Sequence, residues 1–114
     1  MDERTLFDDL VQRVPQLEES FRSHLAGNEG LLPHLMMADV ARFVVKECRG
    51  IDEPVVAEVL DCLTEALENN SDFEELMSVS LVEMFFGESE ALDKIWPLLK
   101  DPLKSVFQSV HQRN

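Results

Sequence analysis

Apolar residues recur every three or four positions along most of the chain. In the first segment they fall at Phe7, Leu10, Val14, Leu17 and Phe21. This spacing places them on one face of an α-helix. No segment has the sustained alternation of apolar and polar residues that is typical of a half-buried strand. The pattern therefore predicts an all-α protein.

Prolines and glycines predict where the helices begin and end. Pro15 should end a first helix near residue 14, because proline removes a backbone donor and clashes with the preceding turn. It should then open a second helix, since proline is tolerated in a first turn. That second helix is expected to end near Gly27. A third helix is expected over 33–49, and a fourth should follow a cap at Asp52 and end at 69–70.

Three further helices are expected in the C-terminal part. Residues 72–86 carry apolar residues on most sides, which is typical of a central, buried helix. Ser71 and Glu74 have the spacing of a capping box at its start. A sixth helix over 89–99 and a seventh starting at 101–102 complete the chain. We therefore expect one domain, 1–114, with six to seven antiparallel helices. They would form an irregular bundle or a short HEAT-like α-solenoid around helix 72–86.

The charge of the chain is concentrated in one segment. The net charge is −13, from 23 acids and 10 bases. Residues 50–93 contain thirteen of the acids and no Lys, Arg or His, so the remainder carries ten acids against all 10 bases. The expected fourth and fifth helices and their flanking residues therefore account for the entire net charge. Such a surface favours a basic protein as partner and repels nucleic acid and anionic membranes.

The acids of the fourth helix form a stripe. Glu58, Asp61, Glu65 and Glu68 step by three, four and three residues, on the face opposite the apolar positions. Neighbouring like charges on a helix cost roughly 0.2–0.5 kcal/mol per pair, so stability does not explain the pattern. We therefore predict a partner-binding surface. Its residues are Glu58, Asp61, Glu65, Glu68, Asp72 and Glu75.

A structural alternative places bases of the third helix on this stripe. Arg42, Lys46 and Arg49 repeat the same three- and four-residue spacing, and Asp39 is placed to pair with Arg42 at i+3. The three bases would lean across and pair with acids of the fourth helix. Three bases cannot neutralise thirteen acids, so a negative surface would remain.

The sequence contains no recognisable catalytic or metal-binding motif. Its three histidines stand apart, and no cluster has the spacing of metal ligands. Exposed carboxylates keep ordinary pKa values, whereas acid catalysis needs a pocket that shifts them. We therefore expect no catalytic residue, no metal, no cofactor and no enzyme activity.

The compartment is predicted from what the chain lacks. No run of 18 apolar residues is present, and the N-terminus has no basic region followed by an apolar run, so neither a membrane span nor a signal peptide is expected. Cys48 and Cys62 lie in helical stretches and should be buried and reduced. These features predict a cytoplasmic protein, and we expect it to be a monomer.

Several short motifs occur in a fixed order along the chain. Val14-Pro15 lies between two short helices, and Leu32-Pro33-His34 leads into Asp39-Val40-Ala41-Arg42. An acidic helix, an apolar helix and a closing segment over 101–112 follow. In this order of elements the chain resembles a family of small bacterial all-α immunity-type proteins, which are associated with polymorphic toxins, including contact-dependent growth-inhibition systems. The resemblance implies a protein that binds and neutralises a cognate toxin domain, but it implies no particular set of binding residues.

Two functions of different classes follow. In the first, the protein is an immunity protein whose acidic helical face blocks a basic toxin, such as a nuclease with a phosphate-binding cleft. In the second, it is a helical adaptor or regulator of a housekeeping protein that uses an apolar groove. Strong salt dependence of binding would favour the first, and weak salt dependence the second.

Overall fold

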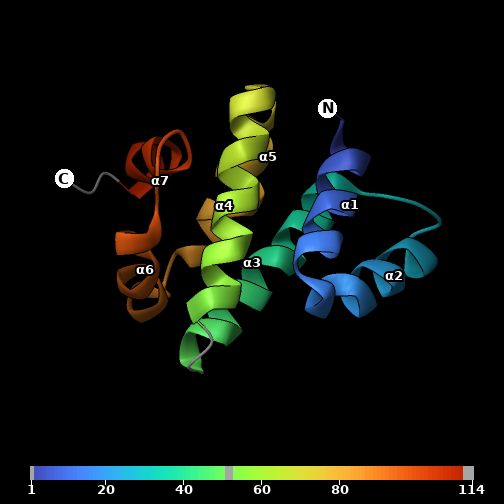
Figure 1. The fold of residues 1–114 in the computed structure, drawn as a ribbon, viewed down its shortest axis with the longest axis horizontal. Helices are drawn as coiled ribbons and strands as arrows, with labels where there is room; N and C mark the ends of the chain where they lie inside the picture. The colour runs from blue at the N-terminus through green and yellow to red at the C-terminus, as the bar shows by residue number, and fades with distance from the viewer. Residues whose placement is uncertain (1, 51–52, 112–114) are drawn as a thin grey trace.

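The computed structural model describes residues 2–50 and 53–111, and within these every regular element is helical (Figure 1). The prediction of an all-α bundle is confirmed. The α-helices are α1 Glu3–Arg13, α2 Glu18–Gly27, α3 Pro33–Arg49, α4 Glu53–Asn69, α5 Phe73–Ser80, α6 Ser89–Ile95 and α7 Leu103–His111. Three short 3₁₀ helices are η1 Pro15–Leu17, η2 Val82–Phe85 and η3 Trp96–Leu98.

Local chemistry explains the boundaries of the first helices. The Asp2 carboxylate caps α1 by accepting a hydrogen bond from the Thr5 N–H at 2.9 Å. The helix ends at Arg13, where Val14 still donates to the Leu10 carbonyl and Pro15 begins η1. The predicted ends of α1 and α2 and the predicted span of α3 are confirmed. The predicted Asp52 cap lies outside the described residues.

The prediction of one continuous central helix over 72–86 is wrong. α5 ends at Ser80, and the chain turns at Leu81 into η2. This turn lets Val82 and Phe85 reach the core, while Val79 and Phe86 remain about half exposed. A straight helix with apolar residues on all sides would need neighbours on every side. Breaking the segment in two removes that requirement.

The expected capping box at the start of α5 is also absent. Asp72 occupies the cap position without a side-chain hydrogen bond to the helix. The turn is held instead by the Asn70 Oδ1, which accepts from the Asp72 N–H at 3.0 Å. Ser71 contributes its backbone carbonyl to the Glu74 N–H and not its hydroxyl.

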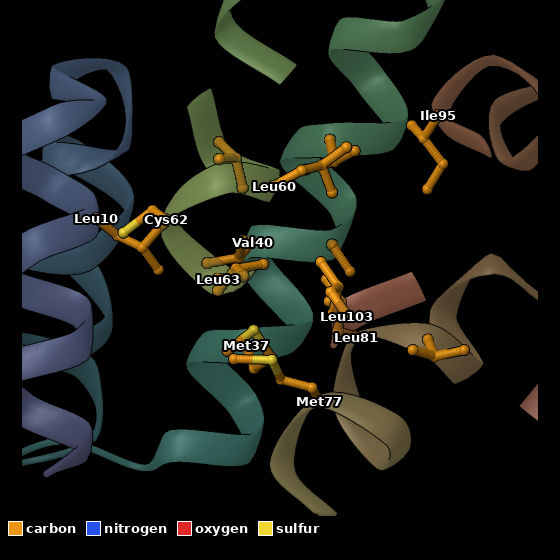
Figure 2. Close-up of a cluster of buried hydrophobic side chains, with 14 of the residues drawn as sticks. Leu10, Met37, Val40, Leu60, Cys62, Leu63, Met77, Leu81, Ile95 and Leu103 are labelled. Carbon is orange, nitrogen blue, oxygen red and sulfur yellow. The ribbon is translucent and has the colours of Figure 1, made fainter. Parts of the chain in front are cut away.

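The centre of the molecule is formed by α3 and α4. α3 packs against α4, α5, α6 and η2, and α4 packs against α1 and α7. Figure 2 shows their side chains converging with those of the surrounding helices, with Val40 and Leu63 in the middle. Both residues are fully buried. The remaining labelled core residues are Leu10, Met37, Leu60, Cys62, Met77, Leu81, Ile95 and Leu103.

Histidines hold two of the junctions between helices. The buried His24 of α2 accepts a hydrogen bond at Nε2 from the Leu32 N–H at 2.9 Å, which fixes the loop that leads into α3. The His34 Nδ1 lies 2.6 Å from the Ser80 Oγ, which joins the start of α3 to the end of α5. Ser80 is buried at this junction.

Candidate protein-binding surface

The six predicted binding residues follow α4 and continue into α5. Glu58, Asp61, Glu65 and Glu68 lie on α4, Asp72 lies in the turn that follows, and Glu75 lies in the first turn of α5. They do not share one environment. Glu58 and Asp61 are half-buried, whereas Glu65, Glu68, Asp72 and Glu75 are exposed.

Arg13 neutralises part of the stripe. It extends from the last turn of α1, which packs against α4. Its Nε donates to the Glu58 Oε1 at 2.6 Å, and its Nη1 donates to the Glu65 Oε2 at 2.7 Å. Both hydrogen bonds raise the pKa of the Arg13 guanidinium further above its already high ordinary value, and the bond to Glu58 has the larger effect. One guanidinium thus holds two carboxylates that are two helical turns apart.

A second cation lies near the middle of the stripe. The Lys100 Nζ is 3.4 Å from the Asp61 Oδ1. Lys100 is in the segment between η3 and α7, and its side chain is 71% exposed, so this pair is a loose surface contact. Asp61, like Glu58 and Glu65, therefore already has a partner of opposite charge within the protein.

The alternative in which α3 supplies these cations is wrong. Arg42 pairs with Asp39 on its own helix, as the i+3 spacing predicted. Arg49 pairs with Glu88, its Nη2 lying 3.2 Å from the Glu88 Oε2. Lys46 makes no ion pair with any residue that the structure describes. The bases of α3 line a groove with Met84 and Glu88, so they do not meet the acids of α4.

One part of the acidic surface that has no ion pairs lies where α4 ends and α5 begins. We call it the acidic turn and define it by four exposed residues, Glu68, Asp72, Glu74 and Glu75. None of the four forms an ion pair within residues 2–50 and 53–111. Three of them belong to the predicted set. Glu74 lies outside that set, because its spacing from Ser71 predicts a capping box. Its place among the thirteen acids of 50–93 is the signal that points to binding.

Helix electrostatics account for part of the acidic turn. Glu74 and Glu75 lie in the first turn of α5, where the positive end of the helix dipole stabilises a negative charge. Glu68 lies in the last turn of α4, where the same effect is unfavourable. The position of Glu68 therefore has no explanation in the stability of its own helix.

A small cavity opens beside the acidic turn. It has a volume of about 150 Å³, and Leu67, Pro102 and Val106 form its apolar walls. Glu74, Ser71 and Ser105 supply its polar edge. A Lys or Arg side chain suits such a cavity, because its aliphatic stem packs on apolar atoms while its charge reaches a carboxylate.

The two cysteines are inert by environment. Both are free and buried, as predicted. Burial raises the pKa of the Cys62 thiol to about 11 and also raises that of Cys48. A raised pKa keeps the thiol protonated and poorly nucleophilic.

Neither a metal site nor a membrane span is found in the part of the chain that the structure describes. No group of three or more His, Cys, Asp or Glu side chains there is arranged to hold a metal ion. No helix there is both long enough and apolar enough to cross a bilayer.

Comparison with known proteins assigns the chain to a family. The family model described as a domain of unknown function, DUF7674, matches residues 7–114. The chain belongs to the DUF7674 family. No curated protein and no solved structure matches it. The matched span begins within α1, so Arg13 and the acidic turn both lie inside the DUF7674 domain.

Proposed function

We propose that this protein binds a positively charged protein through its acidic turn, and that the partner is a toxin domain which the protein neutralises. The observation that carries the proposal is the group of four exposed carboxylates at Glu68, Asp72, Glu74 and Glu75. They have no ion pair within the described residues. Glu68 is also placed against its own helix dipole.

The centre of the proposed interface differs from the one that the sequence suggests. A partner's cation reaches Glu68 or Asp72 without displacing anything. To reach Glu58 or Glu65, it must exchange with Arg13. Exchange of one exposed ion pair for another changes the free energy little. Glu58 and Glu65 would therefore contribute less to the binding free energy than the acidic turn does.

The partner's chemistry follows from the surface. A basic protein is attracted at long range by a net charge of −13, which raises the association rate. Close binding would place one Lys or Arg in the cavity lined by Leu67, Val106 and Glu74. Arginine anchors in such partly apolar pockets carry much of the free energy in many interfaces. A toxin nuclease has a cleft that binds phosphates, and the acidic turn would occupy that cleft in place of nucleic acid.

Affinity capture from the native strain tests the proposal. The test variant, which we call the acidic-turn variant, replaces Glu68 and Asp72 by Lys. The matched control replaces Glu19 and Glu29 by Lys, because these are exposed acids that also lack an ion pair within the described residues, and the change in net charge is equal. Wild type and control should retain a basic protein encoded near the gene for this chain, and the acidic-turn variant should not retain it.

The result that counts against the proposal is equally clear. If the Glu68→Lys, Asp72→Lys protein retains its partner as well as the control does, the acidic turn is not the interface. A captured protein that is neutral or acidic would refute the proposed chemistry of the partner. Circular dichroism of both variants must match wild type, so that a loss of binding is not a loss of folding.

A second candidate function has one observation in its favour. Leu35, Val79 and Phe86 are each about half exposed or more, and the His34–Ser80 contact holds the start of α3 beside the end of α5. An adaptor that used this apolar surface would bind its partner with little dependence on salt. Replacing Leu35 and Val79 by Ser would then abolish capture, whereas the acidic-turn variant would not.

A further inference from the structure

A groove on the outward side of α3 gathers cations in an otherwise acidic protein. It has a volume of about 230 Å³ and runs between the C-terminal half of α3 and the segment that contains η2 and Glu88. Arg42, Lys46 and Arg49 line one side, and Val45 and Met84 provide apolar surface. We call it the α3 groove.

The arrangement of these cations is costly for the helix. Lys46 lies four residues after Arg42 and three before Arg49, so both of its near neighbours on that face carry the same charge. The chain has 23 acids and only 10 bases, yet Lys46 pairs with no acid among the described residues. Lys46 is therefore the base of this groove whose charge no ion pair among the described residues offsets.

The helix dipole explains only part of the pattern. Lys46 and Arg49 lie in the last turn of α3, where cations are stabilised. Arg42 is two turns from that end, beyond the range of the effect. Neither point accounts for a groove beside the cations with apolar surface within it.

The groove's own contacts indicate which anion it suits. Arg42 and Arg49 each hold a carboxylate, from Asp39 and Glu88 respectively, so carboxylates already fit both guanidinium groups. The net charge of the protein opposes the approach of polyanions such as nucleic acids, whose attraction depends on many phosphates. A short protein segment carries few negative charges, so this repulsion is much weaker for it.

We propose that the α3 groove binds a carboxylate-bearing segment of another protein, with the carboxylate on Lys46 and an adjacent apolar side chain on Val45 and Met84. The site is separate from the acidic turn. Arg49 precedes α4 and the acidic turn follows it, and a helix of 17 residues is about 25 Å long. The inference therefore stands on different residues from the proposed function and is tested independently of it.

The test is an NMR titration of the ¹⁵N-labelled full chain with the acetylated, amidated tetrapeptide Glu-Leu-Glu-Glu. Amide shifts should saturate and concentrate at 42–49 and 84–88. Lys46→Glu should weaken binding about fivefold to tenfold, since it replaces an attraction by a repulsion. Arg22→Glu is the matched control, because Arg22 is an exposed base on α2 with the same change in net charge. It should alter affinity less than twofold.

Two further arms separate the proposed ligand from others. A peptide with Ser in place of Leu should bind more weakly, because it lacks the side chain that packs on Val45 and Met84. Inorganic phosphate should bind more weakly than the Glu-Leu-Glu-Glu peptide. The proposal is overturned if phosphate binds the groove more tightly, if Lys46→Glu and Arg22→Glu have equal effects, or if no saturation occurs by about 10 mM peptide.

Discussion

Arg13 offers the sharpest test of how the acidic surface is held together. Replacing Arg13 by Met keeps an aliphatic side chain of similar length and removes the charge. Glu58 and Glu65 then lose their shared cation, and both remain beside Asp61 on the same helical face. We expect the native state to be destabilised and the negative potential of α4 to increase.

The magnitude follows from the exposure of the three side chains. Arg13 is 32% exposed, Glu58 41% and Glu65 58%, so solvent screens both pairs. Exposed pairs contribute about 0.2–1 kcal/mol each. Two pairs, together with the repulsion they leave behind, give a loss of about 1–2 kcal/mol at low salt. For a chain of this size each kcal/mol lowers the Tm by roughly 4–6 °C.

The assay is urea unfolding of wild type and Arg13→Met in low salt and in about 1 M NaCl, where the screening length falls to about 3 Å. The difference between the two proteins should shrink in high salt. A double-mutant cycle with Glu58→Gln isolates the stronger pair. A loss of stability that does not depend on salt would mean that Arg13 acts through packing. A loss below about 0.3 kcal/mol would mean that the two ion pairs contribute nothing measurable.

Further predictions concern three buried residues. Native Cys62, whose pKa is raised to about 11, should react with iodoacetamide at pH 8 far more slowly than the urea-unfolded chain. Because the native thiol keeps its proton while the unfolded one loses it, stability should fall between about pH 8.5 and 11, and Cys62→Ala should reduce this fall, as urea midpoints would reveal. His24→Leu should cost about 1–3 kcal/mol, because the Leu32 N–H loses its acceptor, and hydrogen exchange at that amide should accelerate. Leu63→Ala should cost about 2–5 kcal/mol in the same unfolding assay, whereas loss below 1 kcal/mol would contradict its central place in the core.

The sequence predicted those parts of the fold that local chemistry determines. α3 has the predicted bounds because Pro33 can start a helix and Gly50 follows its end. The first helix ends at Arg13 because Pro15 follows. The segment over 72–86 was predicted wrongly, since a dense apolar run has the same periodicity whether the helix continues or turns. The break at Leu81 is set by packing against α3.

The candidate site was predicted only in outline for the same reason. The sequence identifies which segment is acidic, and the structure places Glu68, Asp72 and Glu75 together in the acidic turn. The sequence does not reveal that Arg13, 45 residues before Glu58, neutralises the other end of the stripe. Which carboxylates are paired depends on tertiary contacts between distant segments, and helical spacing contains no information on these.

The most direct test of the central claim is the salt dependence of the affinity between this protein and its captured partner. Titration calorimetry at a series of NaCl concentrations should give a dissociation constant that rises steeply with salt for wild type. The protein with Glu68→Lys and Asp72→Lys should bind at least about a hundredfold more weakly, which corresponds to about 2.7 kcal/mol. An affinity that is unchanged by salt and by these two substitutions would contradict the claim that the acidic turn is the binding surface.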